Sequence, residues 1–304
     1  MTPGLPTSLL GLNFNCYDFI YEVTVMSTLQ EKTISYYRMR ESRWGYKLVL
    51  GGTKHFGYYP NPTKAITMKR AMMNMEDQLA QALALPAGSR ILDAGCGMGR
   101  VAVHLAQTNG YHIDGVDLLD FNINEAKNYA LKNGQNQLVT FRVGDYTQLP
   151  FADDSFDGIY TMETLYHAPD YNVALAELRR VLKPGGRLVL FEYSVASVET
   201  IMPEALKAFR EIADTSAMHS FPPFIHDEFD FLLQNNGFVN VTTTDITPHV
   251  VPMLKRFHQL ALVPYYFNKL LRRSSKRYPN TLAGYQVYRY RQYWRYNVVV
   301  ADKS

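Results

Sequence analysis

The stretch RILDAGCGMGR, at residues 90–100, constrains the fold of this chain more than any other. Its first half has the apolar pattern of a buried strand, and the VAVHLAQ segment after it has apolar residues at helical spacing. Three glycines lie between the two, at Gly95, Gly97 and Gly99. Glycine accepts positive φ and leaves room beside the backbone, and open α/β sheets bind ligands at the carboxyl ends of their strands. We therefore predict a cofactor site at this turn.

The spacing of the glycines decides between cofactors. A dinucleotide fingerprint reads G-x-G-x-x-G, but Arg100 stands here in place of the third glycine. Asp93 precedes the turn, and its carboxylate would repel a pyrophosphate but suits a ligand with an ammonium group, such as S-adenosylmethionine. The segment LDAGCGMG resembles the first motif of the class I methyltransferases, which use that cofactor. A tight turn without a ligand is the alternative.

Predicted strands and helices alternate over most of the 304 residues, which favours a parallel sheet with right-handed crossovers. We expect the last strand, WRYNVVVADK, to return antiparallel beside the sixth, FVNVTTTDIT. The resemblance implies a Rossmann-like class I methyltransferase fold, with a mostly parallel seven-stranded sheet and helices on both faces. We expect an extension at 1–28, an aromatic helical lid at 29–85, and a methyltransferase domain at 86–304 with a helical cap insertion at about 248–292.

Acidic residues at strand ends are the next candidates for the cofactor site. Asp117 ends the second strand about 20 residues after the glycine turn, where a carboxylate can accept both hydroxyls of a ribose. Asp145 ends the third strand, and the resemblance gives it a contact with the adenine amino group. The expected cofactor-binding residues are Asp93, Gly95, Gly97, Gly99, Asp117, Asp145, Tyr146 and Glu163.

The segment IYTMETLYHAPDYNVALAELRRVLKPGGRLVLFEY resembles the sterol C-methyltransferases and their relatives that methylate other isoprenoids. The resemblance implies catalytic roles for Glu163 and His167 after the fourth strand and for Glu192 at the end of the fifth. If an alkene is methylated, one of these three takes the proton and aromatic faces stabilise the carbocation. If the nucleophile is a phenol or another heteroatom, His167 is the expected base because its ordinary pKa is near neutrality.

These alternatives stay open at the level of function. C-methylation of an isoprenoid or sterol-like acceptor comes first, and O- or N-methylation of an aromatic or polyketide-type metabolite comes second. A partner that keeps the fold without catalysis is a third option. Aromatic residues near the lid and in the insertion are expected to bind a hydrophobic acceptor, although they could equally serve only in packing. The expected acceptor-binding residues are Trp44, His55, Tyr58, Tyr59, Tyr265 and Tyr266.

Composition excludes several other classes of partner. The formal charge of +3 is too balanced for a dedicated nucleic-acid binder, and two distant cysteines support neither a disulfide framework nor a metal site. The sequence lacks an apolar run of the roughly 18 residues that a membrane span needs, so we expect a soluble, cytoplasmic protein. The basic, aromatic insertion leaves peripheral membrane contact open against a solvated charged face, and a homodimer is open too.

Overall fold

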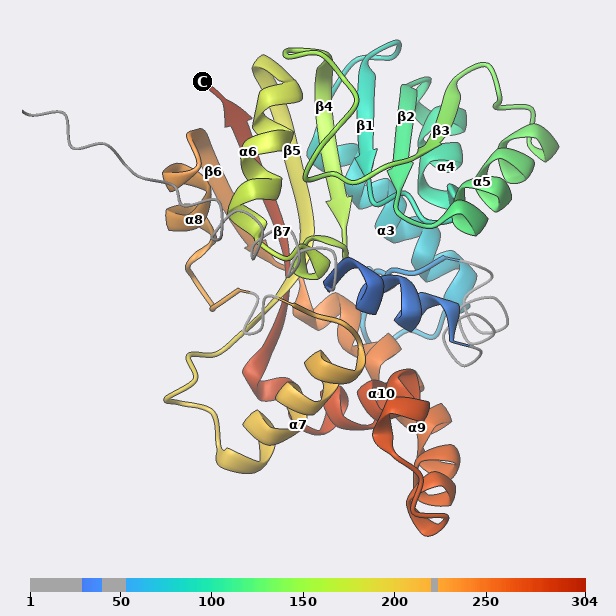
Figure 1. Ribbon diagram of the computed structural model, residues 1–304, viewed down its shortest axis with the longest axis vertical. Helices are drawn as coiled ribbons and strands as arrows, with labels where there is room; N and C mark the ends of the chain where they lie inside the picture. The colour runs from blue at the N-terminus through green and yellow to red at the C-terminus, as the bar shows by residue number, and fades with distance from the viewer. Residues whose placement is uncertain (1–28, 40–52, 220–223) are drawn as a thin grey trace, which may run out of the picture.

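The computed structural model describes residues 29–39, 53–219 and 224–304. A seven-stranded sheet with the order β3-β2-β1-β4-β5-β7-β6 forms its centre (Figure 1). The strands are β1 Arg90–Ala94, β2 His112–Asp117, β3 Val139–Val143, β4 Phe156–Met162, β5 Leu182–Val195, β6 Phe238–Asp245 and β7 Trp294–Lys303. The first five run parallel, and β7 lies antiparallel between β5 and β6. The predicted Rossmann-like fold and the antiparallel return of the last strand are confirmed.

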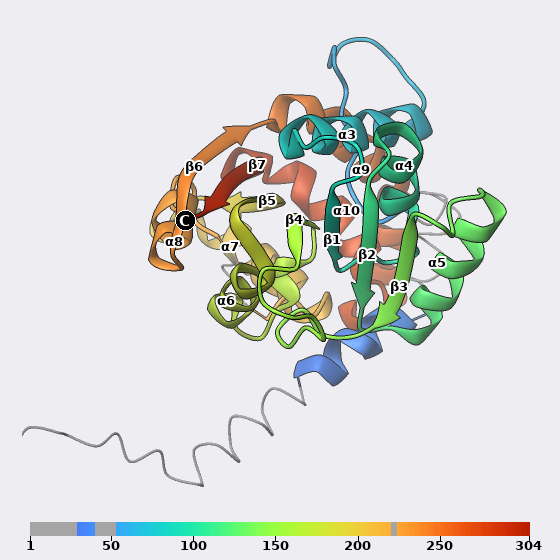
Figure 2. The same cartoon turned by 90° about the horizontal axis from the view of Figure 1, so that it is seen from above.

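Helices cover both faces of the sheet, and each face has its own core (Figure 2). Side chains alternate between the faces along each strand, so Ile91 packs toward α3 and α4 while its neighbour Leu92 packs toward α6. One face carries α3 Met68–Leu83, α4 Arg100–Asn109 and α5 Asp120–Lys132, and the other carries α6 Tyr171–Val181 and α8 Phe229–Asn235. Because helices cover both faces, a ligand can reach the sheet at the carboxyl ends of the strands.

A second group of helices gathers beyond that carboxyl edge (Figure 1). It consists of the helix at 29–38, α7 Pro203–Thr215, α9 Thr247–Leu270 and α10 Pro279–Arg289. The last three pack on one another through α10, which contacts both α9 and α7. The expected cap insertion therefore contributes two helices, and the division of the chain at residues 28, 85, 248 and 292 stays a proposal.

One predicted turn lies inside a strand. The sequence predicts a turn at KPGG, residues 183–186, before the fifth strand, but β5 already begins at Leu182. The pairing with β4 shifts register between Phe156 and Gly158, and Gly185 adopts a φ of 72°. The glycines thus make an irregularity within β5 instead of separating it from α6, because glycine tolerates the backbone geometry that a bulge needs.

Candidate active site

The glycine turn after β1 is held tightly by its neighbours. The N–H groups of Gly95 and Cys96 both donate to the carbonyl of Val116, at 2.9 and 3.0 Å. Gly95 has a φ of 97°, and a Cβ there would lie 2.6 Å from the side chain of Thr164. Only glycine fits this place, since a larger residue would meet both backbone strain and a clash. The turn is therefore built to bring the backbone close to whatever lies above it.

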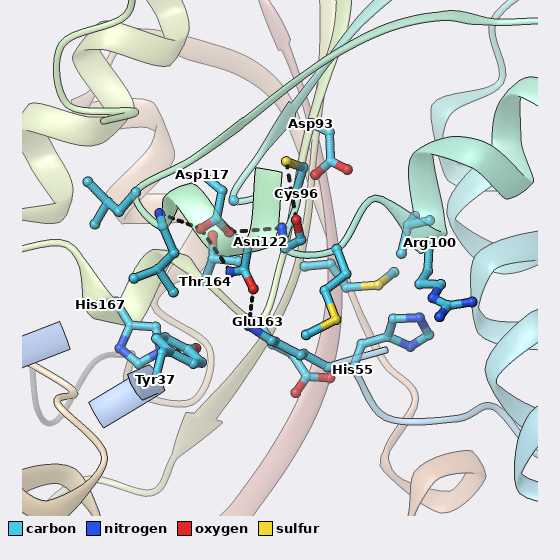
Figure 3. A pocket seen from close by; sticks show the side chains of 18 of the residues that line it. Tyr37, His55, Asp93, Cys96, Arg100, Asp117, Asn122, Glu163, Thr164 and His167 are labelled. Carbon is cyan, nitrogen blue, oxygen red and sulfur yellow. Dashed lines mark hydrogen bonds between the residues drawn. The ribbon is translucent and has the colours of Figure 1, made fainter. Parts of the chain in front are cut away.

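A cavity of about 810 Å³ opens at this turn (Figure 3). It lies over the carboxyl ends of β1, β2 and β4, and the helix at 29–38 closes one side through Thr33 and Tyr37. The polar residues of its wall include Asp93, Asp117, Asn122, Tyr146, Glu163 and Thr164. The arrangement places acidic groups around a glycine-lined floor.

Asp117 is the acidic residue most firmly fixed in this cavity. Its Oδ2 accepts a hydrogen bond from the N–H of Gly97 at 2.9 Å. Its Oδ1 accepts from the N–H of Leu119 and from the side-chain amide of Asn122, both at 2.9 Å. Three donors therefore hold the carboxylate in one orientation at the end of β2. A carboxylate held in this way can receive hydroxyl donors from a ligand without first reorganising.

A second, larger cavity of about 1670 Å³ adjoins the first. Residues from the 29–38 helix, β5, α7, α9, α10 and β7 line it, and most of them are apolar or aromatic. Its aromatic residues are Tyr36, Tyr37, Phe56, Tyr166, Tyr193, Phe209, Phe257 and Trp294. Five residues line both cavities, namely Tyr37, Lys54, His55, Glu163 and His167. The two cavities therefore meet at these side chains.

Glu163 occupies this junction in a strained conformation. Its φ is 57°, an uncommon value for a residue other than glycine, asparagine or aspartate. Its Oε1 accepts hydrogen bonds from the N–H of Phe56 at 2.6 Å and from the hydroxyl of Tyr296 at 2.7 Å. Among the residues that the structure describes, none donates to Oε2. Burial raises the pKa of the carboxyl to about 7.

His167 reaches the same junction but cannot serve as a ready base. Its Nδ1 lies 2.8 Å from the carbonyl oxygen of Ala217, which can only accept, so Nδ1 carries the proton. Nε2 then accepts the hydroxyl of Tyr37 at 2.7 Å. Burial lowers the pKa of His167 to about 3, so the ring is neutral. Figure 3 shows His167 beside Tyr37 of the 29–38 helix, and the bond to Ala217 links the ring to the chain just after α7.

Comparison with known proteins identifies the family. The family described as methyltransferase domain matches residues 92–190. The chain is 37% identical to the S-adenosyl-L-methionine-dependent Diels-Alderase iccD of Talaromyces variabilis, over 88% of this chain and 94% of that protein. It is 36% identical to the O-methyltransferase resE of Aspergillus sclerotiorum, over 70% of this chain and 79% of that protein. The chain belongs to the class I S-adenosylmethionine-dependent methyltransferases.

Solved structures agree on the fold. A geranyl diphosphate methyltransferase, solved in complex with GPP and sinefungin, superposes with a TM-score of 0.70 and covers 91% of this chain and all of its own. Its sequence identity to this methyltransferase is 21%, so the likeness concerns the architecture.

The first cavity fits S-adenosylmethionine by the chemistry of its walls. Burial raises the pKa of Asp93 to about 7, so ionising this group is costly unless a cation lies beside it. The cofactor's ammonium group is such a cation. A Cβ at Gly97 would meet nothing closer than Lys54 Cδ at 4.0 Å, so the floor of the cavity is open there. The expected contacts of Asp93, Asp117, Tyr146, Glu163 and the glycines remain proposals, and all of these residues except Gly99 line the cavity.

Two predicted cofactor residues stand outside the cavity wall. Gly99 is the N-cap residue just before α4, with a φ of 71°, and a Cβ there would lie 2.6 Å from the ring of Phe141, so it serves close packing. Asp145 accepts the N–H of Thr147 at 2.8 Å, and its other oxygen accepts the side-chain amide of Gln30. The 29–38 helix therefore contacts Asp145, the residue for which the resemblance implies the adenine contact.

Glu192 lies apart from the proposed chemistry. It is fully buried and lines neither cavity. Its Oε1 accepts the N–H groups of Thr164 and Leu165 at 3.1 and 2.9 Å, which fixes the loop after β4. Its place under this loop gives it a structural role, and the predicted catalytic role would need contact with a cavity that Glu192 does not line.

The same residue makes the stability of the protein depend on pH. Burial raises the pKa of Glu192 from the ordinary 4.5 to about 8, so the folded protein holds this proton more tightly than the unfolded chain. Its contribution is fully present below pH 4.5 and is lost as the pH rises toward 8. In Glu192→Gln the free energy of unfolding should fall less steeply with pH across this range than it does in the parent. This holds even if the variant is more or less stable than the parent at acid pH. Urea unfolding from pH 5 to 9 measures this, and an unchanged slope would contradict it.

The predicted acceptor-binding residues differ in whether they line a cavity. His55 lines both cavities, whereas Tyr58, Tyr59, Tyr265 and Tyr266 line neither. Tyr58 stacks on His249, and Tyr265 stacks on Tyr285 with ring centres 3.8 Å apart, so both serve packing between segments. Tyr59 is buried in a small core beside Met253. Trp44 lies outside the described residues.

Three further residues line the larger cavity but are not among the site residues predicted from the sequence. Tyr37 comes from the helix at 29–38, within the segment predicted to be a lid, and Trp294 begins the last strand. Lys54 donates to Asn122 at 3.3 Å, and its Nζ lies 4.3 Å from the centre of the Tyr37 ring. The available signal was the high aromatic content, with 22 tyrosines and 16 phenylalanines, which shows that such residues abound but not where they meet.

Proposed function

We propose that this methyltransferase transfers a methyl group to an oxygen nucleophile on a bulky, uncharged, hydrophobic small molecule. The observation that carries the proposal is Glu163, which stands where the cofactor cavity meets the large apolar cavity. Two donors hold its Oε1, Oε2 has no donor among the described residues, and its pKa is raised to about 7. A base of this strength at this junction suits removal of a hydroxyl proton near neutral pH.

The residues of the two cavities divide the work of the reaction. S-adenosylmethionine supplies an electrophilic methyl group on a sulfonium. Aromatic and aliphatic walls hold the acceptor and exclude water, so that the hydroxyl meets the methyl donor in a fixed geometry. Glu163 accepts the hydroxyl proton on Oε2, while Phe56 N–H and Tyr296 O–H keep the carboxylate in place. His167 takes no proton in this scheme because both of its ring nitrogens are engaged.

The lining of the larger cavity supports an uncharged acceptor. Among the described residues of its wall, Lys54 is the one lysine and there is no arginine. Burial lowers the pKa of Lys54, while the nearby carboxylate of Asp117 opposes this shift. Phosphate and diphosphate groups are typically held by several cationic donors. We therefore propose that the acceptor carries no phosphate, unlike the geranyl diphosphate named for the structural neighbour.

Oxygen replaces carbon as our first choice for the methylated atom. The sequence and its resemblance to the sterol C-methyltransferases favour C-methylation of an isoprenoid or sterol-like acceptor. The O-methyltransferase resE, at 36% identity over 70% of this chain, supports an oxygen acceptor, whereas the geranyl diphosphate enzyme shares the fold at 21% identity. Methylation of carbon remains the alternative for the same cavity.

An intramolecular [4+2] cyclisation is the second candidate. It is favoured by the relative named as a Diels-Alderase, whose similarity extends over 88% of this chain against 70% for resE. Such a reaction forms two carbon–carbon bonds from a diene and an alkene of one molecule, with no proton moved and no group lost. The large apolar cavity would act by holding the substrate folded, with S-adenosylmethionine bound but not consumed.

Product mass separates these functions. The purified chain is incubated with trideuteromethyl S-adenosylmethionine and one test substrate at a time. The three test substrates are olivetol, zymosterol and 1,7,9-decatrien-3-one. The proposal expects a 17 Da gain on a phenolic oxygen of olivetol, seen by mass spectrometry and lost with a boiled sample. Label on the sterol carbon alone would overturn it in favour of C-methylation. Conversion of the triene to an isomer of equal mass, faster with cofactor than without, would overturn it in favour of cyclisation.

A further inference from the structure

The second half of α9 carries an exposed apolar face. We call residues 260–273 the α9 tip; it projects from the molecule on the side away from the sheet (Figure 1). Leu260, Val263, Phe267 and Leu270 follow one another at helical spacing and are all exposed, Val263 at 78% and Leu270 at 79%. Tyr266 and Leu271 extend this face and are also exposed. Large aliphatic and aromatic side chains gathered in this way mark an interaction surface.

Basic residues surround the far end of this face. From Thr247 to Tyr278 the sequence has seven lysines and arginines and no aspartate or glutamate. Five of the seven lie at or just beyond the end of α9, and all five are exposed: Lys269, Arg272, Arg273, Lys276 and Arg277. Lys276 lies 3.7 Å from Asp214 of α7, an exposed pair that water screens. The surface thus combines apolar side chains with positive charge.

The same face is part of the wall of the acceptor cavity. Leu260 is 58% exposed and also lines that cavity, as does Pro264 one turn further along α9. Leu260 therefore belongs both to the α9 tip and to the wall of the cavity proposed for the acceptor. A hydrophobic acceptor concentrates in lipid, so a protein that docks there would present its cavity to the substrate's own medium.

This chemistry matches an anionic bilayer surface. In the described part of the chain, no helix has both the length and the apolar character needed to cross a bilayer. An apolar helix face with lysine and arginine beside it suits the boundary between headgroups and acyl chains. Each basic residue near an anionic surface adds to the attraction, and salt screens it.

We propose that the α9 tip docks this methyltransferase onto anionic lipid bilayers. Val263, Phe267 and Leu270 enter the headgroup region, and Lys269, Arg272 and Arg273 contact the lipid phosphates and carboxylates. The proposal goes beyond the proposed reaction and does not depend on which atom is methylated.

Vesicle sedimentation tests the proposal with the full chain. Vesicles of phosphatidylcholine with 30% phosphatidylserine, and vesicles of phosphatidylcholine alone, are compared at about 0.1 M salt. We expect binding to the serine-containing vesicles that falls more than tenfold in the double variant Val263→Asp/Leu270→Asp. Arg272→Glu/Arg273→Glu should remove the preference for phosphatidylserine. Leu131→Asp is the matched control, since Leu131 is 65% exposed on α5, remote from the tip.

Three results would overturn the proposal. One is no pelleting with either vesicle; another is pelleting that Val263→Asp/Leu270→Asp leaves unchanged. The third is a dimer in sedimentation velocity that the same double variant dissociates, without any binding to vesicles, which would make a second copy of the chain the occupant. Circular dichroism and an unchanged melting temperature show that the variants fold, as expected for side chains this exposed.

Discussion

Glu163→Gln is expected to lower kcat by about 10²- to 10⁴-fold, the range that a positioned general base contributes. Glutamine keeps the size of the side chain and can still accept the Phe56 and Tyr296 donors on its oxygen, but it cannot take a proton. Because Glu163 also lines the cofactor cavity, the affinity for S-adenosylmethionine is measured beside kcat, so that a loss of binding is separated from a loss of the base. Steady-state kinetics on the labelled acceptor, with calorimetric titration of the cofactor, measures both quantities.

The pH profile gives this prediction a second readout. A general base works when deprotonated, and the Glu163 pKa is raised to about 7, so the kcat of the parent should rise as the pH increases through about 7. The rise should be absent from the residual activity of Glu163→Gln. Glu204→Gln, at an exposed position in the first turn of α7, makes the same chemical change and should leave the profile intact. A parent-like rate in Glu163→Gln would remove the base from the scheme, and cyclisation, which moves no proton, would then gain support.

Asp117→Ala is expected to weaken binding of S-adenosylmethionine and of its demethylated product by about 10- to 100-fold. Hydrogen bonds to a charged group contribute about 1.5–3 kcal/mol, and 1.4 kcal/mol corresponds to a factor of ten in affinity. The alanine also releases the N–H of Gly97, so the turn loses one of the contacts that shape it. Calorimetric titration with both ligands gives the two dissociation constants directly.

Asp120→Ala is the control for this change. Asp120 begins α5 three residues further along, and its exposed side chain lies 3.9 Å from Arg38. We expect its cofactor affinity to match that of the parent. Asp117→Asn, which keeps the shape of the side chain but not its charge, should fall between the parent and the alanine variant. Unchanged affinity in a folded Asp117→Ala protein would refute the place given to the cofactor.

The sequence determined the features that depend on neighbouring residues. The positive φ angles at Gly95 and Gly97 and the apolar runs of the strands come from short segments, and so does the acidic residue at the end of β2. Local sterics and side-chain periodicity impose such features wherever the segment occurs. Together with the resemblance to the class I methyltransferases, they sufficed for the fold, the order of the last strand and the identity of the cofactor.

Only the tertiary structure decided which strand-end residues share a cavity. Glu163 and Glu192 are both acidic residues near strand ends, yet Glu163 lines both cavities while Glu192 lies buried under a loop. The partners of Glu163, Phe56 and Tyr296, are 107 and 133 positions away in the chain. Periodicity shows that a side chain is buried, but the group it meets is chosen by packing between distant segments, and that choice sets its pKa and its chemistry.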